Sequence, residues 1–224
     1  MQVQAMKRLL GARLWRFCSK LERNSGDYEA LLTGDSWPPF HVYRGQRHPR
    51  LLLYCTKNAL LERWVLDDVF PATWIGIAKY GLPTPDSLEE VRLHASGYRL
   101  PVMFVGDLDP LDLTIFSIIR QSMPAHYLGI DDSWVALSDA HRRGRRPLAS
   151  VCFKMTDLER EHWLIARQLL PDAERLVGPR CFALLESFVK LELEGAASLG
   201  TYPKNFSTLL VRHLARRAAR LTAR

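Results

Sequence analysis

Short apolar runs and helical periods alternate along this chain, an order that is typical of α/β proteins. Three compact apolar runs rich in leucine, β-branched and aromatic residues predict buried strands, at 51–54, 72–78 and 102–105. Each is followed by a turn and then by helical periodicity, which predicts helices at 59–69, 87–98 and 110–120. Ser87 is the expected N-cap of the second helix. Three such units suit a mostly parallel sheet flanked by helices and joined by right-handed crossovers.

The segments on either side of this centre predict helical extensions. A basic amphipathic helix is expected at 6–21, and it either packs its apolar face on its own domain or lies on a membrane or nucleic acid. Residues 24–49 are rich in Gly, Pro and turn formers, which predicts a loop with one or two short strands. Further helices are predicted at 155–170, 180–195 and 205–224, the first opened by a Thr156–Glu159 capping box. The expected division is an N-terminal helix and loop (1–50), an α/β domain (51–195) and a basic C-terminal tail (196–224).

The strand at 102–105 runs into Gly106-Asp107-Leu108-Asp109-Pro110, and this acidic turn carries the main candidate chemistry. Side chains two residues apart in an extended segment point the same way, so Asp107 and Asp109 are expected to project together beyond the carboxyl end of the strand, where open α/β sheets bind ligands. Paired carboxylates repel unless one is protonated or a cation lies between them, and a hard divalent ion, above all Mg²⁺, is the natural partner. The alternative is that Asp109 only caps the following helix while Asp107 is a solvated turn residue. Asp112 is a further candidate ligand, with stabilisation of the helix dipole as its simpler role.

Composition narrows the classes of function. With 224 residues and 47% hydrophobic content, the chain is long enough to bury one sizeable core. A net charge of +7 and a pI of about 9.4 allow an anionic partner without requiring one. The four scattered cysteines lack Cys-x-x-Cys spacing, which argues against zinc and against a disulfide framework and favours a cytoplasmic location. Neither a membrane span nor a signal peptide is expected, so no membrane partner is expected either.

The acidic turn and the helix behind it resemble the Asp-x-Asp motif of Toprim domains. The likeness is to the version in the topoisomerase VI A subunit, its meiotic double-strand-break relatives and the Toprim nuclease subunit of SMC-like plasmid-defence complexes. Three other segments are similar to family segments in the same order: Lys79–Asp86, Met123–Ile130 and Lys190–Glu194, the last resembling a closing Lys-x-Glu segment. The resemblance implies a Toprim-like (Rossmann-like) sheet, a Mg²⁺ site at Asp107 and Asp109, DNA as ligand and a protein partner subunit. A homodimer is a further arrangement that it allows.

Two features depart from that family. Cys55 falls where the family has a Glu that serves as metal ligand or general acid–base group, and a thiolate prefers softer metals than Mg²⁺. The topoisomerase relatives cut DNA with a tyrosine on a preceding winged-helix domain, whereas about 50 residues precede the first predicted strand here, and nothing marks Tyr28 or Tyr43 as a nucleophile. A nuclease would use a metal-bound water instead. The catalytic residues therefore stay unassigned.

Basic clusters are the candidate DNA contacts. They are Arg142, Arg143, Arg145 and Arg146 in an Arg-rich turn, and Arg216 and Arg217 in the tail. Either these arginines contact phosphates or they belong to a solvated surface. The sequence leaves three hypotheses open: a Mg²⁺-dependent DNA-processing Toprim protein with nuclease or topoisomerase-like phosphoryl transfer, a catalytically degenerate Toprim module kept as a DNA-binding or assembly subunit, and another small α/β protein whose likeness to Toprim is accidental.

Overall fold

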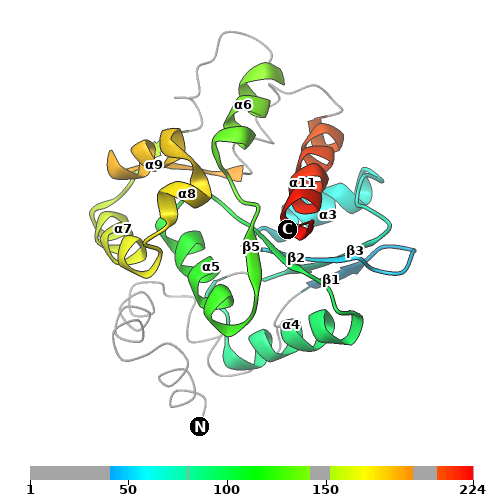
Figure 1. Cartoon of the computed structure of the whole chain (residues 1–224). Coiled ribbons are helices and arrows are strands. Elements are labelled where there is room, and N and C mark those ends of the chain that lie inside the picture. The colour runs from blue at the N-terminus through cyan, green and yellow to red at the C-terminus, as the bar shows by residue number, and fades with distance from the viewer. Residues whose placement is uncertain (1–40, 80, 142–151, 194–205, 224) are drawn as a thin grey trace.

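The computed structural model describes residues 41–79, 81–141, 152–193 and 206–223, arranged as in Figure 1. The elements, in chain order, are β1 (His41–Arg44), β2 (Leu51–Cys55), α3 (Asn58–Leu66), β3 (Trp74–Ala78), α4 (Pro85–Tyr98), β4 (Val102–Val105), α5 (Pro110–Ser122), β5 (Ala125–Tyr127), α6 (Asp132–His141), β6 (Cys152–Lys154), α7 (Asp157–Leu169), α8 (Ala173–Val177), α9 (Pro179–Glu186), β7 (Val189–Leu191) and α11 (Phe206–Thr222). The helix expected at 6–21 and the Arg-rich turn at 142–146 lie outside the described residues.

The main sheet confirms the expected α/β class. Its five strands lie in the order β1-β3-β2-β4-β5, with β1 antiparallel at one edge and the other four parallel. Helices α4 and α5 cover one face, and α3 and α11 cover the other (Figure 1). Every residue of β2, β3 and β4 is buried, as expected for parallel strands covered on both sides. These continuous apolar runs made the three strands recognisable from sequence.

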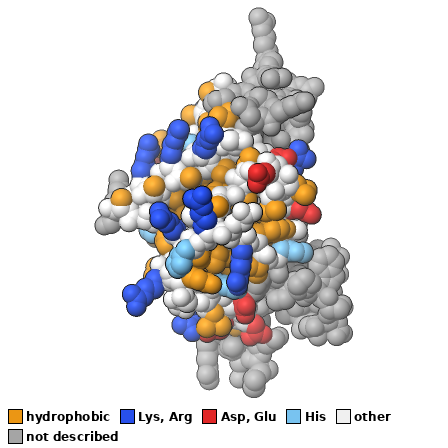
Figure 2. All heavy atoms as spheres, turned by 90° about the vertical axis from the view of Figure 1, so that its right-hand side faces the viewer, with side chains coloured by type: hydrophobic (Ala, Val, Ile, Leu, Met, Phe, Trp, Pro, Cys, Tyr) orange, Lys and Arg blue, Asp and Glu red, His pale blue; other side chains and the backbone are white. Residues whose placement is uncertain are grey.

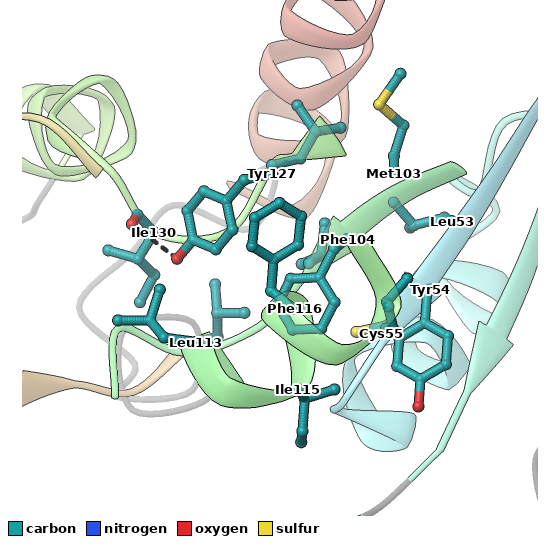
Figure 3. Close-up of a cluster of buried hydrophobic side chains, with 14 of the residues drawn as sticks. Leu53, Tyr54, Cys55, Met103, Phe104, Leu113, Ile115, Phe116, Tyr127 and Ile130 are labelled. Carbon is teal, nitrogen blue, oxygen red and sulfur yellow. Dashed lines mark hydrogen bonds between the residues drawn. The ribbon is translucent and has the colours of Figure 1, made fainter. Parts of the chain in front are cut away.

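The core between β4 and α5 is built on Phe104, drawn with its neighbours in Figure 3. Its ring centroid lies 5.5 Å from that of Phe116 on α5 and 6.0 Å from those of Tyr54 and Tyr127 on the adjacent strands. Buried aromatic side chains of this size contribute most of the apolar area of such a core. This packing fixes the position of α5 along β4, and therefore also the position of the acidic turn that connects them.

Several helix ends differ from the sequence expectations. Thr84, not Ser87, caps α4, because its hydroxyl accepts the Ser87 N–H at 3.2 Å and Pro85 occupies the first helical position. Helix α3 ends at Leu66, earlier than expected. The capping box of Thr156 and Glu159 is confirmed at the start of α7.

The helix expected at 180–195 is wrong beyond Glu186. Phe188 adopts a left-handed backbone conformation with φ of 57°, which ends the helical stretch. Residues Val189–Leu191 then form β7, antiparallel to β6. Helical periodicity continued through this segment in the sequence, but pairing with β6 decided its conformation. Among the described helices, none is both long and apolar enough to cross a bilayer.

Candidate metal centre

The turns after β2 and β4 emerge side by side at the carboxyl edge of the sheet. The two strands are parallel neighbours with Cys55 opposite Val105, so Lys57 and Asp107 each lie two residues beyond an aligned pair. The Nζ of Lys57 lies 2.5 Å from Oδ2 of Asp107. The Asp107 side chain is 2% exposed and that of Lys57 is 24% exposed, so this ion pair is largely shielded from water.

Three aspartates gather at this edge. Asp107, Asp109 and Asp112 each offer a carboxylate oxygen, and these oxygens lie within 4.8 Å of one another. Asp109 is the N-cap of α5 and accepts the Asp112 N–H at 2.7 Å, which confirms the capping geometry expected for Asp109 and Pro110. Because that cap begins α5 directly after the turn, the helix returns Asp112 towards the end of β4.

Asp112 holds the turn together from inside. Its Oδ2 accepts the backbone N–H of Asp107 at 2.6 Å and the hydroxyl of Thr56 at 2.7 Å. A Cβ at Gly106 would lie 2.6 Å from the same oxygen, so only glycine leaves room for it. Asp112 therefore links the ends of β2 and β4 through hydrogen bonds, which is a larger role than stabilising the helix dipole.

The strand β7 closes over the acidic turn. Leu108 and Leu191 exchange two backbone hydrogen bonds of 3.0 and 3.1 Å, and the Leu193 N–H donates to Oδ1 of Asp107 at 2.7 Å. In the sequence, the segment Lys190–Glu194 is distinguished only by its likeness to a closing Lys-x-Glu segment. Its described part, through Leu193, lies against the acidic turn, and Lys190 pairs there with Glu159 at 2.8 Å and Glu192 at 3.4 Å.

Burial and mutual repulsion raise the pKa values of the carboxyl groups in this cluster. Burial, then the neighbouring charge of Asp107, raises the pKa of Asp109 to about 6. Burial and the charges of Asp109 and Asp107 raise the pKa of Asp112 well above its usual range. Burial works to lower the pKa of Lys57, but the carboxylates of Asp107 and Asp112 outweigh it and hold that pKa above its ordinary value. The charges of Lys57 and Lys190 offset part of the repulsion among the three carboxyl groups, and the raised pKa values of Asp109 and Asp112 show that the cluster favours holding a proton or a further cation.

The donor set fits a hard divalent cation. All three aspartates present oxygen, which is the ligand atom that Mg²⁺ and Ca²⁺ prefer. After the hydrogen bonds described above, one oxygen of Asp109 and one of Asp112 have no hydrogen-bond partner among the described residues. The Lys57 ammonium already occupies Oδ2 of Asp107, so an ion that uses this oxygen competes with it. The cluster suits a metal ion whose identity the ligands leave open.

Cys55 lies at the end of β2 beside this cluster but is not chemically equivalent to a carboxylate. Burial raises the pKa of its thiol to about 12, so the group is neutral at physiological pH. The thiol contacts the backbone of Lys57, with its Sγ 3.4 Å from that residue's carbonyl oxygen and 3.4 Å from its nitrogen. A neutral thiol is a poor ligand for a hard ion and a poor base at neutral pH.

Reasoning from the sequence missed Lys57 and gave Asp112 too small a part. The sequence pattern alone assigned Lys57 no role. The available signal was its place two residues beyond a buried strand, the same offset that Asp107 has from β4. This shared offset places Lys57 beside Asp107 only because β2 and β4 are neighbouring strands, which the sequence alone does not reveal.

The two tail arginines named as DNA contacts have different surroundings. Arg216 is exposed on α11. Arg217 points inward, where it pairs with Asp131 at 2.7 Å and donates to the carbonyl oxygens of Leu128 and Gly129 at 3.2 Å. Its side chain is 13% exposed, so in this conformation it fastens α11 to the segment after β5 and offers little surface to a phosphate.

Replacing Arg217 with Gln is expected to lower the free energy of unfolding by about 2–3 kcal/mol, because it leaves the Asp131 carboxylate and two carbonyl groups without their donor. Hydrogen exchange would rise first in α11. The matched control is Arg216→Gln, which removes an exposed charge and should change stability by less than about 0.5 kcal/mol. Equal urea-unfolding midpoints for the two variants would contradict this structural role.

No protein-family model matches this chain, and no curated protein is significantly similar to it.

Proposed function

We propose that this chain is a Toprim-like DNA-processing protein that binds Mg²⁺ through Asp107 and Asp109 and acts with a protein partner. The observation that carries the proposal is the cluster of three carboxylates at the carboxyl edge of a mostly parallel sheet, within 4.8 Å of one another. Ligands of open α/β sheets bind at this edge. The contact between β7 and the acidic turn supports the likeness to Toprim domains as well. The Lys-x-Glu sequence that begins in β7 and the Asp-x-Asp turn both resemble segments of that family, and backbone hydrogen bonds join them here.

Within this proposal, Mg²⁺ would supply a positive charge that orients and polarises a phosphodiester. Asp107 and Asp109 would hold the ion, and Asp112 would fix the turn through Thr56 and the Asp107 N–H. Neutral Cys55 cannot serve as the general base. The remaining catalytic groups would therefore come from a partner or from the metal-bound water.

Exposed arginines supply a surface for the DNA backbone. The side chains of seven of them have no hydrogen-bond or ion-pair partner among the described residues: Arg44, Arg47, Arg50, Arg99, Arg212, Arg216 and Arg220. Figure 2 views the side of the molecule on which the β1 edge lies, and Lys and Arg side chains are spread over it among apolar ones. Helix α11 carries four arginines and no acidic residue. Unpaired guanidinium groups of this kind suit phosphate contacts without base recognition.

The second candidate is a non-catalytic Toprim-like module that binds DNA or organises an assembly. Two observations favour it: Lys57 already provides a cation to the acidic cluster, and Cys55 replaces the family's carboxylate. The two candidates differ in a plasmid-cleavage assay with Mg²⁺, run with and without the partner. The first requires cleavage that Asp107→Asn abolishes while DNA binding persists. The second requires DNA binding without cleavage in the wild type.

The double change Arg212→Gln with Arg216→Gln is expected to weaken DNA binding by about tenfold or more at low salt, because each lost phosphate contact reduces the salt slope by about 0.9. Fluorescence anisotropy with a short duplex at several salt concentrations measures both quantities. The control is Arg92→Gln, an exposed arginine on α4 that pairs with Glu89. Unchanged affinity and slope in the double variant would remove α11 from the DNA surface.

A further inference from the structure

A concave site lies at the β5 edge of the sheet, away from the three aspartates. It is a half-open cavity of about 550 Å³ bounded by α5, β5, α8 and α11. In Figure 1, β5 runs between α8 and α11, with α5 beside it. The volume is in the range of small-molecule sites, roughly 300–1,000 Å³. None of Asp107, Asp109 and Asp112 lines it.

The cavity walls carry an excess of positive charge. Four arginines and two aspartates line it, together with one histidine: Arg120, Arg175, Arg217, Arg220, Asp131, Asp172 and His126. The formal charge of these groups is therefore +2 with His126 neutral. Concave sites with low-dielectric walls concentrate such a field and attract anions.

The two aspartates are already committed to arginines. The Asp172 carboxylate accepts hydrogen bonds from both terminal nitrogens of Arg120 at 3.0 Å and from one terminal nitrogen of Arg175 at 2.9 Å. Asp131 pairs with Arg217 at 2.7 Å. The guanidinium of Arg120 also lies 5.4 Å from the Phe116 ring centroid. These contacts fix Arg120 and Arg217 as walls of the cavity, and they pair both carboxylates with a positive charge, so neither aspartate is left unpaired to repel an anion.

Two donors in the cavity remain unused. The side chains of Arg220 and His126 have no ion-pair or hydrogen-bond partner among the described residues. Arg220 comes from the last turns of α11 and His126 from the edge strand, so they reach the cavity from two different elements. Leu176 and Leu221 add apolar wall beside them. A ligand with a phosphoryl group and an apolar or aromatic body would satisfy both kinds of surface.

We propose that this cavity binds a phosphoryl group, with Arg220 and His126 as its direct contacts and Arg175 beside them. The group belongs either to a free nucleotide or to a DNA backbone, because both present the same oxyanion. Arginine matches the geometry of that oxyanion through its paired N–H groups. The site is separate from the acidic cluster and goes beyond the function proposed for that cluster.

The test is titration calorimetry on the full chain with EDTA present, so that metal binding at the aspartates plays no part. Inorganic phosphate, a nucleoside monophosphate and a short duplex are the probes. The wild type should bind at least one of them saturably, and Arg220→Gln with His126→Gln should weaken it tenfold or more. Arg92→Gln is the matched control, since Arg92 is an exposed arginine that pairs with Glu89 on α4 and does not line the cavity.

The probes separate the two sources of the phosphoryl group. Tighter binding of the monophosphate than of phosphate identifies a nucleotide site, and binding of the duplex alone identifies a backbone contact. Absence of binding to all three probes would overturn the proposal, and so would equal affinities of the wild type and a double variant whose thermal midpoint is unchanged. Because EDTA is present, failure here leaves the proposed Mg²⁺ site untouched, and failure of that site leaves this result untouched.

Discussion

Replacing Lys57 with Met should lower the free energy of unfolding by about 2 kcal/mol in metal-free buffer. The ammonium lies 2.5 Å from the Asp107 carboxylate, whose side chain is 2% exposed, so its loss leaves a buried charge without its partner. The expected cost is below the 3–5 kcal/mol typical of a fully buried pair because Lys57 is 24% exposed and partly screened by water. Urea unfolding in EDTA measures the effect.

Mg²⁺ should restore more stability to Lys57→Met than to the wild type. The variant lacks the ammonium that competes for Oδ2 of Asp107, so its affinity for the ion should rise, and a ligand that binds only the folded state stabilises it by mass action. Lys57→Arg keeps a positive charge and is the control. The account of this cluster would be wrong if Lys57→Met were as stable as the wild type in EDTA.

The second large effect concerns Asp112, where Ala and Asn should behave differently. Asp112→Ala removes the acceptor of the Thr56 hydroxyl and the Asp107 N–H, and two unsatisfied buried donors should cost about 2–4 kcal/mol. Asp112→Asn keeps an oxygen acceptor and removes a like charge from the cluster. In metal-free buffer it should be at least as stable as the wild type.

The pH dependence of Asp112→Asn gives an independent check. The pKa of Asp112 is raised on folding by burial and by Asp109 and Asp107, so the folded state holds its proton to higher pH than the unfolded state does. Stability from this group is therefore greatest at low pH and falls as pH rises above the unfolded value of about 3.9. The wild type should lose stability relative to Asp112→Asn over that rise. Parallel curves, or an Asn variant as unstable as Ala, would contradict the arrangement.

The sheet was predictable because its strands are covered on both faces. Such strands read as unbroken apolar runs, so β2, β3 and β4 stood out from the sequence. Strands β6 and β7 were not predicted because each has three residues and their pairing joins segments far apart in the chain. A pattern measured in one short segment carries no information about a distant partner.

In the candidate site, too, the residues placed by local pattern were predictable, and those placed by contacts between distant segments were not. Asp107 and Asp109 were found because local alternation places them on one side of a strand end, and the capping role of Asp109 follows from Pro110 beside it. Lys57 reaches Asp107 across 50 positions, through a register that a single sequence does not reveal. The inward direction of Arg217 depends likewise on Asp131, which lies in the segment between β5 and α6, far from α11 in the chain.

The role of Asp109 as N-cap does not compete with a role as metal ligand. Its Oδ1 accepts the Asp112 N–H, and its second oxygen remains available. Asn caps helices about as well as Asp, so Asp109→Asn preserves the cap while removing the charge. The substitution therefore separates the two interpretations of this residue.

The most direct test of the account is Mg²⁺ titration by calorimetry on the wild type, Asp107→Asn and Asp109→Asn. We expect saturable binding in the wild type and at least tenfold weaker binding in each variant, with the thermal midpoint of metal-free Asp109→Asn no lower than that of the wild type. Wild-type binding that both substitutions leave unchanged, or no binding by the wild type under conditions where it is folded, would contradict a metal centre at Asp107 and Asp109.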